Sequence, residues 1–257
     1  GMIGVDATLG HGGHAGHILP RLAPGGVLIG MDVDPLQLPR TEARLRALGH
    51  DAGSFRAVRS NFAGIGKITA ESGPLDFLLA DLGCSSMQID DPSRGFTFKA
   101  DGPLDMRMNP GRGLSARAWL ARVSPATLAG VLRDNADEDA ADHLADVLAG
   151  HDWPTTTRLT EAIRRAHGPG KPDEHIELSV RKVFQAVRIA VNDEFSALDA
   201  LLRALPDVLA PGGRVAFLTF HSGEDRRVKK ALLHGMRAGI FAGDEVPLAT
   251  AGAAERR

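Results

Sequence analysis

The sequence predicts an α/β fold built on a parallel sheet, and two observations predict it. Short apolar runs alternate with helical patterns through the first third of the 257 residues. Several of these runs end in an aspartate, and a glycine-rich loop follows the first of them at once. Near-continuous apolar runs of this length suit strands that are buried on both faces of a parallel sheet.

The predicted strands are the apolar runs themselves. Four fall in the first third of the chain, and a fifth follows a turn at Pro211-Gly212-Gly213. A long helix precedes the fifth strand, since apolar residues recur at helical spacing from Phe184 to Leu205. The five strand ranges are Ile3–Asp6, Val27–Asp32, Phe55–Val58, Phe77–Asp81 and Val215–Phe220.

Far more residues lie between the fourth and fifth strands than one crossover helix requires. Ser124-Pro125 predicts a helix start, with serine as the N-cap and proline at the first helical position. Thr157 predicts the cap of a second helix, which ends at Gly168-Pro169-Gly170. We therefore expect residues 106–182 to form a helical insertion, and residues 1–105 and 183–257 to form the main domain. Such an insertion can wall a ligand site beyond the carboxyl ends of the strands.

The composition restricts the class of protein. The net charge of −2 gives no global basic signature, so contacts with nucleic acid would come from local patches. The single cysteine, Cys84, excludes an internal disulfide framework and fits a reducing compartment. No apolar run approaches the roughly 20 residues of a spanning helix, and no signal peptide is evident. We expect a cytoplasmic protein without a membrane partner, whose two ends are trimmed relative to the natural protein.

The most informative segment is the loop V-D-A-T-L-G-H-G-G-H-A-G-H, which runs from Val5 to His17. Its glycines tolerate positive φ and carry no Cβ that would block a ligand. Gly10-x-Gly12-x-x-Ala15, with Asp32 about 20 residues further on, satisfies the loose dinucleotide pattern. Dinucleotides and S-adenosylmethionine both use such a loop.

Asp6, at the end of the first strand, favours S-adenosylmethionine. A carboxylate there would repel the pyrophosphate that a dinucleotide places at the helix N-terminus. It would instead suit the cationic amino-acid end of the methyl donor. A nicotinamide-dependent oxidoreductase remains the alternative.

Further candidates follow the fourth and fifth strands. Asp81-Leu-Gly-Cys-Ser-Ser-Met-Gln88 places an acid beside the first loop. A Cys84 thiolate could add to a pyrimidine ring, but no base lies beside it in the sequence. His221 could be a base, a hydrogen-bonding anchor or a helix cap. We expect His14 to shape the cofactor loop, and we predict no metal site, because no second ligand has metal spacing.

The segment from Arg94 to Arg107 interleaves cations with aromatic residues. Phosphates bind arginine and lysine, and unstacked bases bind flat side chains. The chain has no tyrosine, so any stacking on a base would come from Phe, Trp, His or Arg, with Phe96 and Phe98 as candidate platforms.

Four motifs occur in order across nearly the whole chain: D-A-T-L-G-x-G-G-H, then D-L-G-x-S-S-x-Q-x-D-D-P-x-R-G-F-x-F-x-x-D-G-P-L-D-M-R-M, then F-Q-A-x-R-I-x-V-N-x-E, and F-H-S-x-E-D-R-x-V-K. With them the chain resembles the MraW/RsmH family of bacterial methyltransferases, which modify N4 of a cytidine in the decoding region of 16S ribosomal RNA. The resemblance implies a Rossmann-like class I methyltransferase with a helical insertion that helps to recognise RNA. It implies the small ribosomal subunit as partner and leaves a homodimer open.

The resemblance also implies site residues. The methyl donor, S-adenosylmethionine, would lie on Gly12, Gly13, His14, Asp32, Phe62, Asp81 and Gln88, next to Asp6 and Gly10 of the loop. A group near Asp81 would accept the proton of the amine, with Asp101, Asp105 and His221 as lesser candidates. The cations that we assign to RNA phosphate are Arg94, Lys99, Arg107, Arg112, Arg181, Lys182 and Arg188.

The chain departs from the family pattern inside the insertion and at both ends. The Tyr-Gly-Glu-Glu motif is replaced by Asn135-Ala-Asp-Glu138, and His-Pro-Ala is replaced by Leu178-Ser-Val180. An N-terminal stretch like His-x-Pro-Val-Leu and a C-terminal one like Asn-Pro-Arg-Ser-Arg-Ser are absent. These departures keep a second alternative open, a non-catalytic or retargeted RNA-binding paralogue.

Overall fold

The structure is a computed structural model that describes residues 1–22, 24–168, 170 and 172–242. Its centre is a five-stranded sheet in the order β3-β2-β1-β4-β5, and every pair of neighbouring strands is parallel. The strands are β1 (Ile3–Asp6), β2 (Val27–Asp32), β3 (Phe55–Arg59), β4 (Leu75–Asp81) and β5 (Leu209–Leu218). The predicted α/β fold with a parallel sheet is confirmed, and the first four strands lie within two residues of their predicted bounds.

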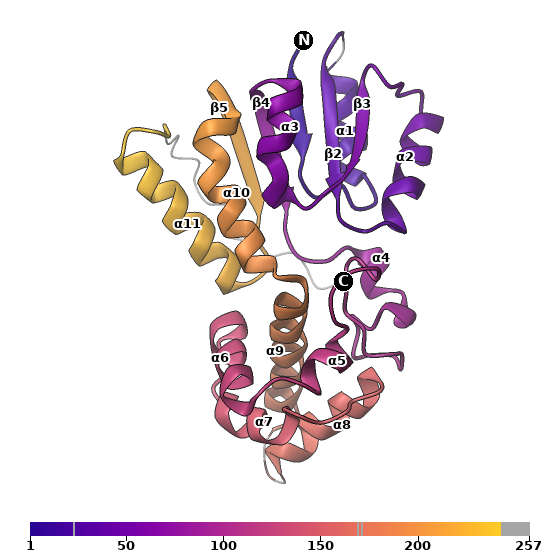
Figure 1. Ribbon diagram of the computed structural model, residues 1–257, viewed down its shortest axis with the longest axis vertical. Helices are drawn as coiled ribbons and strands as arrows, with labels where there is room; N and C mark the ends of the chain where they lie inside the picture. The colour runs from indigo at the N-terminus through magenta and orange to yellow at the C-terminus, as the bar shows by residue number, and fades with distance from the viewer. Residues whose placement is uncertain (23, 169, 171, 243–257) are drawn as a thin grey trace.

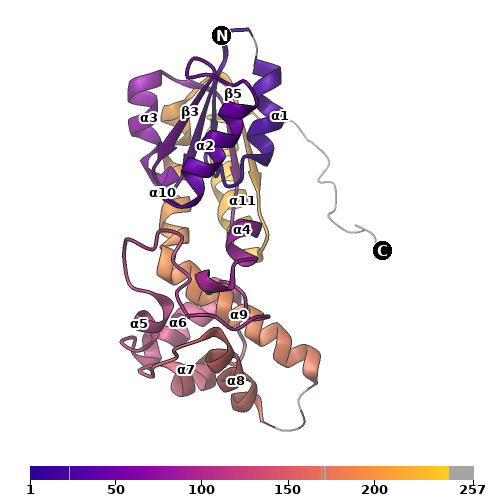
Figure 2. The ribbon, with the colours of Figure 1, turned by 90° about the vertical axis from the view of Figure 1, so that its right-hand side faces the viewer.

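Helices cover both faces of the sheet. Helices α1 (Gly13–Leu22) and α2 (Gln37–Ala47) pack against one apolar cluster, in which Leu28 and Phe55 are fully buried. Helices α3 (Ile65–Ser72) and α10 (Glu194–Val208) pack against a second cluster on the other face, and Figure 2 shows them opposite α1. The short 3-10 turn η1 (Phe62–Gly64) leads from β3 into α3, and α11 (Ser222–Arg237) follows β5. Burial on both faces explains why the strands are nearly continuous apolar runs.

The last strand differs from its prediction at both ends. It begins at Leu209, so Pro211-Gly212-Gly213 lies within β5 instead of forming a turn before it. The pairing with β4 shifts there, from Leu75 opposite Leu209 to Phe77 opposite Arg214, so β5 has three more residues than β4 between these two pairs. Gly212, within this irregular stretch, has a φ of +78°, which glycine adopts readily. The strand ends at Leu218 because the next residues turn away to begin α11.

The predicted long helix before β5 is two helices. Helix α9 (Asp173–Asn192) ends at Asp193, whose φ of +53° interrupts the helix before α10 begins. The apolar spacing continued through this break because both helices bury one face, α9 in the helical region and α10 against the sheet. The helical spacing of apolar residues therefore predicted the buried faces correctly, but it gave no sign that the helix axis changes direction at Asp193.

A helical region lies between β4 and β5, beyond the carboxyl ends of the strands (Figure 1). Before its first long helix come α4 (Ser86–Ile89) and the 3-10 turn η2 (Pro92–Arg94). The region then continues with α5 (Ala116–Leu120), α6 (Pro125–Ala136), α7 (Ala141–Leu148), α8 (Thr156–His167) and α9. It has its own apolar core, in which Leu128, Leu144, Ile163 and Val183 are fully buried. This core also includes Phe96 and Val187, so division of the chain at residues 105/106 and 182/183 stays a prediction.

The helix starts of this region test the capping predictions. Ser124 caps α6 as predicted, since its hydroxyl accepts a hydrogen bond from the Thr127 amide at 3.2 Å. The cap of α8 is Thr155, whose hydroxyl accepts from the Arg158 amide at 3.3 Å, so the assignment of this cap to Thr157 was wrong. Thr157 lies in the first turn instead. The helix ends at Gly168, as predicted.

The two internal departures from the family pattern meet in space. Glu138 follows α6, and Ser179 lies on α9; both are buried. The Ser179 hydroxyl donates to Glu138 Oε2 at 3.1 Å, and the Ala140 amide donates to Oε1 at 3.0 Å. Nearby, the Asn135 amide group donates to the Ala186 carbonyl at 3.2 Å. The departures therefore form one packed and hydrogen-bonded contact between α6 and α9.

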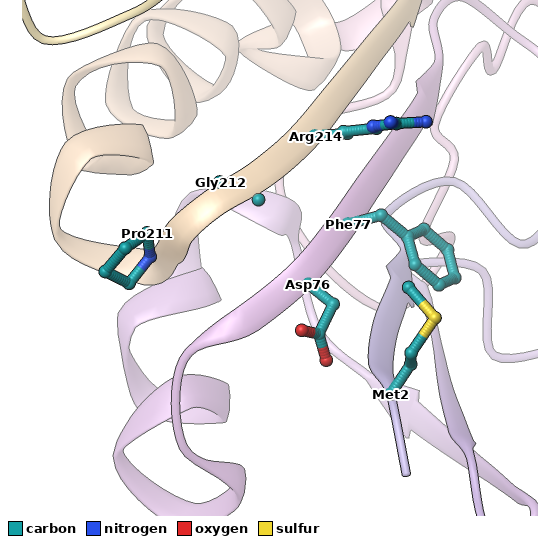
Figure 3. Close-up of a pocket in the computed structure, with 7 residues that line it drawn as sticks. Met2, Asp76, Phe77, Pro211, Gly212 and Arg214 are labelled. Atoms are coloured by element: carbon teal, nitrogen blue, oxygen red, sulfur yellow. The ribbon is translucent and has the colours of Figure 1, made fainter.

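A hollow of about 560 Å³ opens at the amino ends of β1, β4 and β5 (Figure 3). Met2, Asp76 and Arg214 are among the residues that line it. Ligands of open parallel sheets bind at the carboxyl ends, so this hollow lies at the edge opposite the expected site. Among the residues that the structure describes, no helix is long and apolar enough to cross a membrane.

Candidate functional site

Three carboxylates meet at the carboxyl edge of the sheet, because Asp6, Asp32 and Asp81 end the adjacent strands β1, β2 and β4. Asp6 is fully buried. Burial raises the pKa of Asp6 to about 6, and the charges of Asp81 and Asp32 act in the same direction. Its Oδ1 accepts a hydrogen bond from the Thr8 amide at 3.2 Å, whereas Oδ2 has no hydrogen-bond partner in the described structure.

The glycine loop crosses above these carboxylates. Gly10 and Gly12 have φ of +50° and +76°, and the Gly10 amide donates to Asp32 Oδ2 at 2.8 Å. A Cβ on Gly12 would come within 2.8 Å of the Thr41 side chain. A Cβ on Gly13, at the start of α1, would meet no atom within 4 Å. The loop is therefore packed against α2 on one side and open at the N-terminus of α1.

Asp32 already has two backbone donors, since its Oδ1 accepts from the Asp34 amide at 2.8 Å. Burial raises the pKa of Asp32 above its ordinary value, although these backbone hydrogen bonds oppose the rise. An ionised carboxylate has about four acceptor positions, so two remain for a ligand.

His14 and Asp81 form a pair on the open side of the loop. His14 Nε2 lies 3.1 Å from Asp81 Oδ2, and the His14 side chain is about half exposed. The Asp81 amide donates to the Thr8 hydroxyl at 2.7 Å, which fixes the end of β4 against the loop after β1. Asp81 Oδ1 is buried and has no hydrogen-bond partner among the described residues. Asp6 and Asp81 thus each present one unpaired oxygen.

Gln88 and Phe62 lie at the flanks of this edge. Gln88 is buried on α4, where it forms a capping box with Ser85. Its side-chain amide donates to Asp34 Oδ2 at 3.0 Å. Phe62 begins η1 directly after β3 and is partly buried against the sheet.

Asp34 is a fully buried carboxylate that was not predicted from the sequence. Its Oδ1 accepts from the amides of Leu36 and Gln37 at 2.9 and 3.3 Å. Its Oδ2 accepts from Arg94 Nη1 at 2.9 Å, in addition to Gln88. The Asp32-Val33-Asp34 pattern after a buried strand was the available signal, but only its first acid was used.

Arg94 is therefore bound within the protein. Its side chain is 12% exposed, and its Nη2 donates to the carbonyls of Arg107 and Met108 at 3.1 and 3.0 Å. Asn192 of α9 holds the same segment, accepting from the Met108 amide and donating to the Met106 carbonyl, both at 2.7 Å. Arg94 therefore joins Asp34, which follows β2, to the segment at Arg107 and Met108. We predicted that Arg94 binds an RNA phosphate, but in this structure its guanidinium is already occupied.

Several other predicted RNA contacts also have internal partners. Arg188 is bound to both carboxylate oxygens of Glu194, at 2.8 and 3.0 Å, and Arg107 is bound to Asp105. Lys182 donates to the Asp137 carbonyl at 2.6 Å. In the part of the chain that the structure describes, three predicted cations are exposed without a side-chain partner: Lys99, Arg112 and Arg181.

The two predicted aromatic platforms point into the protein. Phe96 is 9% exposed and belongs to the core of the helical region. Phe98 is partly buried against the same core, with its ring edge to face with Phe184 at 5.5 Å between centroids. Phe96 is thus covered by the core, and Phe98 is partly covered, so their role as base platforms stays a prediction that this packing does not favour.

Cys84 is a partly buried thiol that the Arg188 guanidinium contacts. Burial raises its pKa, although the nearby Arg188 guanidinium, which donates to Sγ at 3.3 Å, opposes the rise. A raised pKa leaves less thiolate for attack. Among the described residues, no group of three or more histidines, cysteines or acids is arranged to hold a metal ion.

The lesser candidates for the proton acceptor differ in their surroundings. Asp101 is exposed, and its Oδ1 lies 3.4 Å from the Thr157 amide in the first turn of α8. Burial raises the pKa of Asp105, but its hydrogen bonds and ion pair with Arg107 outweigh burial and leave the pKa lowered. His221 precedes α11 at the carboxyl end of β5. Its Nε2 lies 3.2 Å from Glu224 Oε1, at angles that do not make a hydrogen bond.

The raised pKa of Asp6 predicts a pH dependence of stability. The folded state holds the Asp6 proton more tightly than the unfolded chain, whose value is 3.8. The stabilisation is complete below the unfolded pKa and is lost as pH rises through the folded value near 6, by about 3 kcal/mol in total. We expect the free energy of unfolding from urea titrations to show this loss in the wild type and not in Asp6→Asn. Parallel pH profiles for the two proteins would contradict it.

Comparison with known proteins identifies a family that this chain matches. Residues 1–256 match the model of the MraW methylase family. The ribosomal RNA small subunit methyltransferase H 2 of Alkaliphilus metalliredigens is 47% identical over 94% of this chain and 71% of its own length. Similar proteins from Lachnoclostridium phytofermentans and Halorhodospira halophila, named small subunit methyltransferase H 1 and H, are 45% and 42% identical. The alignment with the Lachnoclostridium protein covers 94% of this chain and 68% of the relative. The alignment with the Halorhodospira protein covers 98% of this chain and 78% of the relative.

The chain belongs to the MraW methylase family. Methyltransferases of the MraW family use S-adenosylmethionine, which decides between the two cofactors that the glycine loop left open. The nicotinamide-dependent alternative is therefore wrong.

Proposed function

We propose that this chain transfers the methyl group of S-adenosylmethionine to N4 of a cytidine in the decoding region of 16S ribosomal RNA. The observation that carries the proposal is the group of three carboxylates at the carboxyl edge of the sheet, under a glycine loop. The relatives named as small subunit RNA methyltransferases support the substrate, since they match nearly the whole chain.

The residues present fit a cationic donor. Asp6 Oδ2 is a buried acceptor without a partner among the described residues, and a positively charged ligand would satisfy it. The open space at Gly13 allows the ligand to approach the backbone. Asp32 would bind the ribose hydroxyls through its two remaining acceptor positions, and Phe62 would lie against the adenine. Gly10, Gly12, His14 and Gln88 complete the proposed donor site.

The sulfonium of the donor supplies an electrophilic methyl group, and the protein has to prepare the amine that attacks it. The N4 amine of cytosine is a weak nucleophile because its lone pair is shared with the ring. Holding it in line with the methyl group is mostly a task of positioning. As the nitrogen–carbon bond forms and the sulfur–carbon bond breaks, one N4 proton leaves, and we assign its acceptance to Asp81 Oδ1. His14 holds the other oxygen of this carboxylate and so orients it.

The experiment that tests the proposal supplies labelled S-adenosylmethionine to small ribosomal subunits from a strain that lacks the family's enzyme. We expect label in the 16S RNA and none in large subunits treated in parallel. Absence of label from the small subunit, with donor binding confirmed by calorimetry, would contradict the proposal.

Three exposed cations are proposed to bind RNA phosphate. Lys99, Arg112 and Arg181 have free side chains among the described residues, whereas Arg188 is held by Glu194. Neutralising one phosphate contact lowers the slope of log affinity against log salt by about one. We expect Arg112→Met to flatten the slope in filter binding by this amount. An unchanged slope would remove Arg112 from the interface.

The proposal includes a cytoplasmic location, where small subunits are assembled, and the homodimer stays a prediction for light scattering to test. The binding-only paralogue loses its support. The departures that motivated it form a packed contact between α6 and α9, and Asp137 among them pairs with Arg226 of α11.

A further inference from the structure

Phe220 is an exposed aromatic side chain at the carboxyl edge of the sheet. Among the large apolar side chains that the structure describes, it has the largest exposed fraction, 69%. It follows β5 by two residues and precedes His221, the residue before α11. An aromatic ring left in water at this edge is available to a ligand.

The ring of Phe220 lies near the segment that directly follows the proposed proton acceptor. Leu218 is paired with Asp81 in the sheet, and the Leu82 amide donates to the Leu218 carbonyl at 3.0 Å. The segments that follow β4 and β5 stay close to each other past the strand ends, since a Cβ on Gly83 would lie 3.8 Å from Phe220 Cδ2. The ring therefore lies over Gly83, two residues beyond Asp81.

The backbone of Phe220 is fixed, although its ring is open. The Phe220 amide donates to Glu224 Oε2 at 2.8 Å, and Glu224 is buried in the first turn of α11. The neighbouring His221 ring packs near Phe195, with 5.8 Å between the ring centroids. A ring on a fixed backbone loses little conformational freedom when a flat ligand covers it.

We propose that the Phe220 ring is the stacking platform for the target pyrimidine base. This inference rests on the proposed function and adds to it the residue that holds the base. The base would stack on the open face of the ring, with its exocyclic amine directed to Asp81. Such a platform replaces Phe96 and Phe98, whose rings are packed into the helical region.

The test compares an aliphatic and an aromatic replacement. Phe220→Leu keeps an apolar side chain but removes the π-face, and we expect kcat/KM for small subunits to fall about 5- to 150-fold, the usual range for one lost base–aromatic contact. Phe220→Trp should retain activity within a few-fold. Both variants should bind S-adenosylmethionine and melt as the wild type does. The control is Leu233→Ala, which removes another exposed apolar side chain from α11.

Each outcome decides the inference. Loss in Phe220→Leu with rescue in Phe220→Trp supports stacking. Unchanged activity in Phe220→Leu, or equal loss in both variants, overturns it while the proposed function stands. Failure of the wild type to methylate small subunits would overturn the proposed function first and the inference with it.

Discussion

Asp81→Asn is expected to lower the rate constant of methyl transfer about 100- to 10,000-fold, the usual contribution of a positioned acid or base. The substitution keeps the size of the side chain but removes the acceptor that would take the N4 proton. The structure leaves Asp81 Oδ1 buried and unpaired, while Oδ2 is held by His14. Single-turnover kinetics at saturating donor measure the effect, and calorimetry measures donor affinity separately.

The matched control for this experiment is Asp101→Asn. Asp101 is exposed and lies near the start of α8, so the same change of charge should leave transfer within a few-fold of the wild type. Full turnover in Asp81→Asn with normal donor affinity would exclude Asp81 as the proton acceptor.

The second large effect is on stability. Arg94→Met is expected to lower the free energy of unfolding by about 3–5 kcal/mol, because it leaves the fully buried Asp34 carboxylate without its ion pair. It also leaves the carbonyls of Arg107 and Met108 without the guanidinium that now binds them. Urea denaturation of the purified variants measures the loss.

Two further variants give this prediction its controls. Arg112→Met removes an exposed arginine and should change stability by less than about 0.5 kcal/mol. Adding Asp34→Asn to Arg94→Met should recover part of the loss, since the unpaired buried charge is then removed. A loss below about 1 kcal/mol in Arg94→Met would show that this ion pair does not stabilise the fold.

The sequence predicted what depends on local pattern. Strands buried on both faces are apolar along their length, so β1 to β4 could be read directly. Their carboxyl ends fall at one edge of a parallel sheet, and this placed Asp6, Asp32 and Asp81 together from the sequence alone. The start of α6 and the end of α8 were also predicted from local signals, namely the N-cap serine Ser124 and the glycine Gly168.

What the sequence could not predict depends on contacts between distant residues. Arg94 lies 60 residues from Asp34, and nothing near Arg94 shows that its charge is already paired. An interleaved run of cations and aromatics is equally typical of an RNA surface and of a packed loop, and here Arg94 and Phe96 are packed. The exposure of Phe220 was not predicted either, because the fifth strand was expected to continue through Phe220, whereas β5 ends at Leu218.

The most direct test of the central claim is the identity of the methylated nucleoside. Small-subunit RNA from the labelled reaction is digested to nucleosides and separated by chromatography with mass detection. The proposed site predicts label in N4-methylcytidine, and its loss when Asp81→Asn replaces the wild type. Label in 5-methylcytidine would instead require a nucleophile that adds to the ring, in conflict with the raised pKa of the Cys84 thiol, and would contradict the account.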